Sequence, residues 1–250
     1  MIGELEVEVV DDRVTRLRAT PPVAAKVLPG PVLMLVGSAA GLLEGDELGI
    51  EIRMAAGARL TVRTTAATLA HPCPGGGSTA TTVRVELGAG AALAWLPEPL
   101  VACAGCRHDS QARLSLGPEA GCVWLESVAL GRHGEEAGEA GLRLDVELDG
   151  RPLLRDALRW PVGAPAGDPA TYGTARHVTA LHLLGRDAEV GDIDRGALPF
   201  AGPGATVRAL ATNAHELEAQ LDRFQSSFLS ILGFDARSGT PRHAEALSHV

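Results

Sequence analysis

The chain has 250 residues and a formal net charge of −9, with 46% hydrophobic and 21% charged residues. This balance is typical of a soluble globular protein and excludes a largely disordered chain. The excess of acidic groups disfavours non-specific attraction to phosphate backbones or anionic lipid, so we expect neither nucleic acid nor a membrane as a partner. Lys26, the only lysine, lies outside any Gly-Lys-Ser/Thr element, which excludes a P-loop nucleotide site.

Alternating apolar and mostly charged residues predict β-strands along much of the chain. The clearest cases are residues 5–9, 48–54, 83–87 and 142–148. Each segment places apolar side chains on one face of a strand and leaves the other face to solvent. Glycine-containing turns, such as Asp149-Gly150, separate these segments. The pattern predicts a mainly β protein, built as a sandwich or as an antiparallel, solenoid-like stack.

A weak internal repeat favours the stack. The segment Gly-Ala-Arg-Leu-Thr-Val at 57–62 recurs in similar form at 90–95 and 120–125, so Leu60, Leu93 and Val123 lie about thirty residues apart. Near-equal spacing is typical of β units laid one on another. The alternative is that Gly-Ala is merely a common turn in an alanine-rich sequence.

The last third of the chain contains one clear helix. Asn213 and Glu216 form a capping-box pattern, and an apolar stripe follows until Gly233 ends the helix. A second, short helix is expected near residues 181–184, and a Pro/Gly-rich loop at 162–169. We find no second core, so we predict a single domain over residues 1–250 in which 234–250 form a flexible tail.

Cysteine and histidine residues leave three interpretations open. Cys103 and Cys106 are separated by two residues in a Cys-x-x-Cys pattern, with His108 just after them and His71 and Cys73 upstream. Thiolates and imidazoles at such spacing can hold zinc, although the second ligand pair is irregular. A redox motif would need a helix start, which the β-type sequence does not offer. Loop cysteines without a metal are the favoured interpretation.

Several carboxylates stand at unusual places. Asp46 and Glu47 lie in a glycine-bounded turn, Glu126 lies in the largely apolar run 122–130, and Glu139 ends the glycine-rich segment that follows. A carboxylate on an apolar strand must be exposed, paired or bound to a cation, and Arg132 is one candidate partner. The alternatives are a solvated strand face with a charged turn, or an acid/base pair of the glycosidase type.

Four segments, taken in order, resemble motifs of the UreD (UreH) family of urease accessory proteins. They are Gly-Leu-Leu-Glu-Gly-Asp-Glu-Leu at 41–48, Thr-Thr-Ala-Ala-Thr at 64–68, Leu-Ala-Trp-Leu-Pro-Glu-Pro at 93–99, and Leu-Gly-Arg at 130–132 with Gly-Glu at 138–139. The resemblance covers roughly residues 3–232. The chain departs from the family pattern where Ala40 and Glu44 replace glycines.

The resemblance implies a fold and a role. The fold is two stacked β layers, partly β-helical, with a small helical part near the C-terminus. The role is that of a scaffold, not an enzyme, which takes part in nickel delivery to urease. A cytoplasmic location is expected from the residues themselves, since residues 1–4 do not start like a signal peptide, no apolar run reaches membrane-spanning length, and four cysteines do not make a disulfide scaffold. The implied partners of the scaffold are the urease apoprotein and the accessory protein UreF, with the GTPase UreG recruited through UreF. No cofactor is expected to stay bound, and the nickel ion is in transit.

The resemblance also implies a nickel passage lined by carboxylates. Oxygen ligands on separate strands attract Ni²⁺ without completing a tight shell. We expect Asp46 and Glu47 near one mouth of the passage, and Glu126 and Glu139 along its interior. Two alternatives remain. One is a β-rich adaptor unrelated to nickel, and the other is a carboxylate hydrolase, which the eight aromatic residues of the chain make less favourable.

Overall fold

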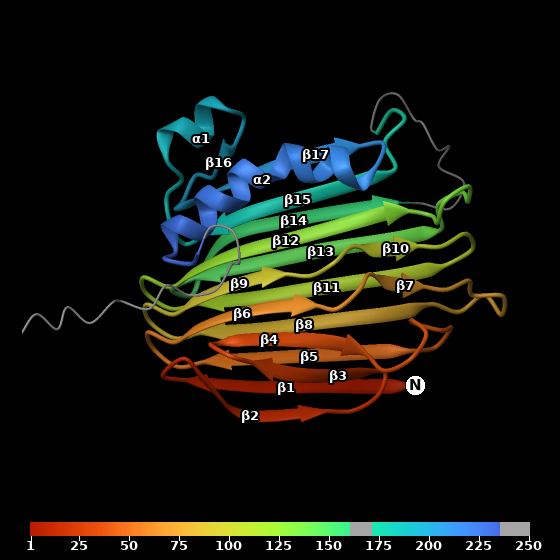
Figure 1. Ribbon diagram of the computed structural model, residues 1–250, viewed down its shortest axis with the longest axis horizontal. Helices are drawn as coiled ribbons and strands as arrows, with labels where there is room; N and C mark the ends of the chain where they lie inside the picture. The colour runs from red at the N-terminus through yellow and green to blue at the C-terminus, as the bar shows by residue number, and fades with distance from the viewer. Residues whose placement is uncertain (161–171, 236–250) are drawn as a thin grey trace, which may run out of the picture.

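The computed structural model describes residues 1–160 and 172–235 and has two β-sheets stacked face to face (Figure 1). The predicted class, mainly β with two stacked layers, a solenoid-like part and a small helical part near the C-terminus, is confirmed. The predicted loop at 162–169 lies outside the described residues. None of the helices in the described ranges is long and apolar enough to cross a membrane.

Within the described residues, one sheet has seven strands. Their spatial order is β14 (Arg151–Trp160), β13 (Glu139–Leu148), β11 (Arg107–Leu116), β8 (Thr79–Leu87), β5 (Glu47–Met54), β1 (Ile2–Val10) and β2 (Arg13–Ala19). The five strands from β13 to β1 are parallel, so the expected antiparallel stack was wrong. Each turn of the chain returns to this sheet in the same direction after crossing the other sheet, which makes the pairing parallel. Of these seven strands, only β14 and β2 pair in antiparallel fashion, at the two edges. We call this the seven-stranded sheet.

The second sheet, which we call the ten-stranded sheet, covers one face of the first. Its main order is β16 (Leu198–Pro199), β17 (Gly204–Ala211), β15 (His177–Leu184), β12 (Gly121–Leu130), β9 (Ala92–Leu96), β6 (Arg59–Thr64), β4 (Val32–Gly37) and β3 (Val23–Leu28). Two short strands, β7 (Thr68–Ala70) and β10 (Leu100–Ala102), pair beside the end of β12. The strands β4, β6, β9 and β12 are parallel, and antiparallel strands flank them.

The central part of the chain winds as a flattened coil. From β5 to β13 the chain passes alternately to one sheet and the other, and each turn adds one parallel strand to both. Because parallel pairing keeps equivalent positions in line, the alternating apolar residues stack into inward-facing rows. One such row is Val7, Ile52, Val85, Leu114 and Val146, all of which are buried.

The predicted repeat is confirmed for its first two copies, but the strand register of the third copy differs from the predicted one by one residue. Leu60 pairs with Leu93 as expected, but Leu93 pairs with Cys122 rather than Val123. The shift matters because it places Trp124 beside Trp95, and their rings stack with centroids 4.8 Å apart and planes 9° apart. The stacked indoles, rather than the Gly-Ala turns, mark the equivalent positions.

The predicted helix near the C-terminus is confirmed as α2 (Ala214–Ile231). The Asn213 side chain accepts the Glu216 backbone N–H at 2.9 Å, and the Glu216 carboxylate accepts the Thr212 N–H at 2.9 Å. The apolar stripe of α2 packs on the outer face of the ten-stranded sheet. Phe234 is fully buried beyond the helix, so order continues past Gly233, and the rest of the predicted tail from 236 onward lies outside the described residues.

The helix expected near residues 181–184 was wrong, because this segment belongs to strand β15. That strand is buried on both faces, between the seven-stranded sheet and α2, so both faces carry apolar side chains. A short apolar run of this kind has no period that distinguishes a strand from a helix. The only other helix in the described ranges is the short α1 (Val190–Asp194).

Candidate functional site

A cavity of about 330 Å³ lies between the two sheets, at the end of the stack where β7 and β10 pair. The starts of strands in the seven-stranded sheet form one wall, with Leu48 and Leu142 among its residues. The ends of strands in the ten-stranded sheet form the other wall, which includes Leu35 and the stacked Trp95 and Trp124. The walls are therefore mostly apolar, and the few polar side chains among them stand out.

His108 is one of these polar side chains. It lies on β11, faces the other sheet and is only 2% exposed. Its Nδ1 lies 2.8 Å from the Thr79 hydroxyl oxygen, which holds the ring in place. Burial lowers the pKa of His108 to about 4, against the opposite influence of Asp109. The imidazole is therefore neutral at physiological pH.

Glu126 lies in the wall formed by the ten-stranded sheet. The alternation of β12 turns Cys122, Trp124, Glu126 and Val128 toward the seven-stranded sheet, so a carboxylate occupies a position that is otherwise apolar. Burial is the main cause that raises the pKa of Glu126 to about 7, and Asp156 adds to it. Two neighbours lower the pKa of Glu126, but by less than burial raises it. They are Arg208 and the Trp124 indole, whose N–H has no hydrogen bond of normal geometry. Near neutral pH this carboxyl can therefore exchange a proton for a cation.

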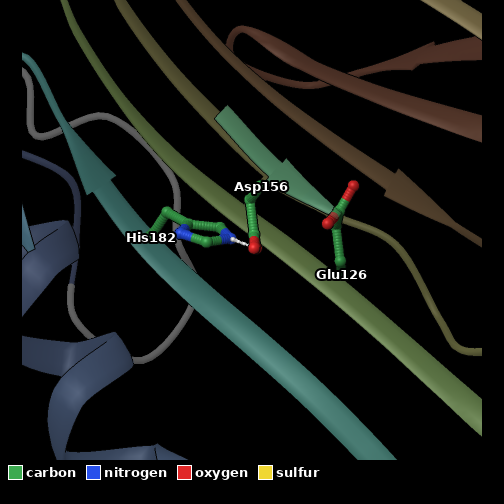
Figure 2. Close-up of side chains that lie close together, drawn as sticks. All are labelled: Glu126, Asp156 and His182. Carbon is green, nitrogen blue, oxygen red and sulfur yellow. Dashed lines mark ion pairs between the residues drawn. The ribbon is translucent and has the colours of Figure 1, made fainter. Parts of the chain in front are cut away.

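Glu126 also belongs to a cluster with Asp156 and His182 (Figure 2). One potential metal-ligand atom from each of the three side chains lies within 4.8 Å of the other two. Asp156 comes from β14 in the seven-stranded sheet, whereas Glu126 and His182 come from the neighbouring strands β12 and β15. Among the described residues, this is the one grouping of three such side chains that could hold a metal ion.

The cluster is held by a buried imidazole and a guanidinium. His182 has no exposed surface, and its Nε2 lies 3.7 Å from Oδ2 of Asp156. Arg208, on β17, forms a close ion pair with the same carboxylate. Burial lowers the pKa of His182 to about 4, and the opposing influence of Asp156 is partly offset by Arg208. The His182 imidazole is therefore neutral. It lies beside the negatively charged Asp156, which is paired with the positively charged Arg208.

Of the four predicted metal-site residues, the structure places Glu126 in the cavity wall and the other three outside it. Asp46 is buried at the start of the seven-stranded sheet, where its carboxylate accepts the Leu43 N–H at 2.9 Å. Its contact with the amino group of Met1 is the main cause that lowers the pKa of Asp46. Glu47 follows on the exposed surface, next to the cavity residue Leu48.

Glu139 begins β13 on the outer face of the seven-stranded sheet. Its carboxylate lies 3.7 Å from Arg107 on the neighbouring strand, and its side chain is 32% exposed. The structure therefore does not bring Glu139 next to Glu126. Arg132 forms an ion pair at 2.8 Å with Glu135, three residues further along the chain, rather than with any of the four candidate carboxylates.

Of the residues considered for zinc, Cys73 and Cys103 lie close enough to Cys106 to add to burial in raising its pKa, but within the described ranges no three of these side chains bring their ligand atoms together. His71 contacts the Ala40 carbonyl oxygen at 2.9 Å, and His108 contacts Thr79. The Cys106 thiol lies 3.5 Å from the Glu139 carbonyl oxygen, and burial raises the pKa of Cys106 to about 12. Within residues 1–160 and 172–235 these side chains form no group of three potential ligands. The favoured interpretation, loop cysteines without a metal, stays a prediction.

Asp156, His182 and Arg208 were missed by sequence reasoning, although a signal was present for the first. On β14, Leu154, Asp156, Leu158 and Trp160 follow at every second position and face the core. A carboxylate in such an apolar row indicates a special environment. His182 gives a weaker signal, because the run around it is apolar in both directions.

Comparison with known proteins gives matches over most of the chain. Residues 9–238 match a family model described as UreD urease accessory protein. The chain is 37% identical over 242 residues to the urease accessory protein UreD of Parafrankia sp. (strain EAN1pec), covering 84% of this chain and 81% of that protein. It is 37% identical over 209 residues to urease accessory protein UreD 3 of Streptomyces griseus, covering 79% and 81%. The UreD of Frankia casuarinae is 34% identical over 242 residues, covering 84% and 76%.

Proposed function

The chain belongs to the UreD family of urease accessory proteins, and we propose that it delivers nickel during assembly of the urease metallocentre. In this role it acts in the cytoplasm as a scaffold between the urease apoprotein and UreF, and UreG joins through UreF. Proteins of this family are accessory proteins rather than enzymes, which sets aside the hydrolase alternative.

The single observation that carries the nickel proposal is the carboxylate of Glu126 in the wall of the inter-sheet cavity. A divalent ion that enters an apolar cavity needs a ligand to replace part of its water shell. Glu126 and the more exposed Glu98, with a few nearby hydroxyl groups, would bind such an ion weakly, whereas several thiolates would trap it. A weak ligand at this point favours passage over storage.

The other three acidic residues support the proposal through their position. Asp46 and Glu47 directly precede the cavity residue Leu48, and Glu139 lies three positions before the cavity residue Leu142. All of them therefore lie at the cavity end of the stack. Asp46 pairs with the Met1 amino group and Glu139 with Arg107, so among these three described residues the attraction for cations comes mainly from Glu47.

The test is urease activation in cells that produce this chain with apo-urease, UreF and UreG. Replacing Glu126→Ala removes the ligand, and Glu126→Gln removes its charge while keeping its size. We expect both variants to lower urease activity and nickel content, with unchanged co-purification of the partners. The matched control is Glu86→Gln. The Glu86 side chain is 65% exposed, on the face of the seven-stranded sheet that points away from the other sheet.

The adaptor alternative predicts a different result. If the chain only joins its partners, both Glu126 variants should activate urease as well as the wild type and co-purify equally well. Full activation with Glu126→Ala would therefore contradict a role of this carboxylate in nickel transfer.

A further inference from the structure

We propose that Glu126, Asp156 and His182 form a three-ligand binding site for a divalent transition-metal ion beside the inter-sheet cavity. The three side chains come from β12, β14 and β15, so the site exists only where the two sheets are stacked (Figure 2). This inference deepens the proposed function and rests on it for the identification of the ion as nickel. Glu126 links the site to the cavity, because it belongs to both.

The geometry requires only small side-chain movements. Ligand atoms about 2.0–2.2 Å from a metal ion lie about 3–3.5 Å from one another. The nitrogen of His182 and the oxygen of Asp156 are already 3.7 Å apart, and the atoms of all three residues lie within 4.8 Å. Closing the site around an ion therefore calls for movements of the ligand atoms of about 1–2 Å.

His182 gives independent support for a ligand at this place. Its side chain is fully buried, and neither ring nitrogen has a hydrogen-bond partner. A buried polar atom without a partner is costly, and such atoms are rare in folded proteins. The imidazole points at the Asp156 carboxylate beside Glu126 (Figure 2), and an ion placed between the carboxylates would satisfy its Nε2.

The donor set indicates the class of ion. One imidazole nitrogen and two carboxylate oxygens suit first-row divalent ions such as Ni²⁺ or Zn²⁺, whereas Mg²⁺ and Ca²⁺ prefer oxygen ligands alone. The absence of thiolates from this group keeps binding reversible. Three protein ligands also leave positions for water, through which the ion can enter and leave.

Arg208 provides a counter-charge for the metal-free state. Its guanidinium pairs with Asp156, and its side chain is 39% exposed, so it can swing into solvent without disturbing the core. A divalent ion that takes its place neutralises the two carboxylates fully, whereas one guanidinium neutralises only one of them. The ion and Arg208 therefore compete for the same carboxylate.

The test is a calorimetric titration of the untagged full-length chain with NiCl₂ alone. We expect one ion per chain in the wild type and a loss of affinity of about tenfold or more in His182→Gln and Asp156→Asn. His215→Gln, which changes an exposed histidine, should bind as the wild type does. Equal affinity in His182→Gln and the wild type would overturn the site, and circular dichroism checks that each variant is folded.

Arg208→Gln gives a second test with the opposite sign. Because this change removes the competing cation, we expect Ni²⁺ to bind several-fold more tightly than in the wild type. Mere structural damage would weaken binding instead, so weaker binding in this folded variant would overturn the competition between Arg208 and the ion.

The two proposals fail in different ways. If the isolated chain binds Ni²⁺ through His182 while Glu126→Ala still activates urease fully, the site stands and the role in nickel delivery fails. If activation depends on Glu126 but Ni²⁺ binding is unchanged in His182→Gln, the role stands and the three-ligand site fails.

Discussion

Nε2 of His182 lies 3.7 Å from Oδ2 of Asp156, although the two residues belong to opposite sheets. Both strands, β15 and β14, pair in antiparallel fashion beside the last parallel strands of the coil. The polar cluster therefore lies where the regular winding ends. Here the inward-facing rows no longer need to repeat, which allows charged side chains between the sheets.

A bulky side chain in the inter-sheet cavity should block the passage of an ion through the cavity. Ser110 lines the cavity from β11, so Ser110→Phe fills empty space rather than displacing packed atoms. We expect urease activation to fall several-fold, with a loss of unfolding free energy of about 1–3 kcal/mol at most. Activity and nickel content of urease after co-expression measure the effect.

The control is Ser115→Phe, which places the same side chain on the same strand but at an exposed position. Activation by this variant should match the wild type. If Ser110→Phe activates urease equally well, the cavity does not carry the ion.

The free energy of unfolding should decrease as the pH is lowered, because His108 titrates at a lower pH in the folded protein than in the unfolded chain. Its pKa is lowered from 6.5 to about 4 in the folded protein, so the unfolded chain binds more protons between these values. The free energy of unfolding therefore decreases by about 3 kcal/mol from this group as the pH falls from about 6.5 to about 4. Urea unfolding at several pH values measures this slope.

Replacing His108→Gln should flatten the pH dependence by that amount, because glutamine can still reach Thr79 but does not titrate. His182 and Glu126 also shift with folding, but they contribute equally to both proteins and cancel in the comparison. Parallel curves for the two proteins would show that His108 titrates normally in the folded state.

Gly138 should tolerate no side chain. A Cβ atom at this position would lie 2.5 Å from the Cys106 sulfur and closer still to the Cys103 carbonyl oxygen. We expect Gly138→Ala to lower the free energy of unfolding by at least about 2 kcal/mol. Gly49→Ala is the control, since its nearest neighbour would be 3.9 Å away, and denaturant unfolding compares the two. Equal stability would mean that the turn before β13 adjusts freely.

Loss of the cap on α2 should cost a moderate amount of stability. The Asn213 side chain satisfies the Glu216 N–H, and α2 covers the outer face of the ten-stranded sheet. Asn213→Ala should lower the free energy of unfolding by about 1 kcal/mol, whereas Asn213→Asp should be nearly neutral. Thermal unfolding monitored by circular dichroism measures both, and equal losses in the two variants would argue against a capping role.

The sequence alone predicted the strands whose two faces differ and the capped helix, and it left a sandwich or a stack open until the resemblance favoured two stacked layers. The strands and the helix cap depend on neighbouring residues, because alternation and capping are local patterns. It also pointed to Glu126, since a carboxylate within an apolar strand is a local anomaly. It failed at residues 181–184, where both faces of β15 are buried, and at the third repeat, where the pairing of Trp95 with Trp124 decides the register.

Only the tertiary structure decided which acidic residues meet. Glu139 appeared equivalent to Glu126, yet it faces outward beside Arg107. Asp156 and His182, which had no evident link to Glu126, lie beside it because the two sheets stack face to face. The direction of a side chain follows from local alternation, but its neighbour across the core depends on the pairing of distant strands, which no local pattern encodes.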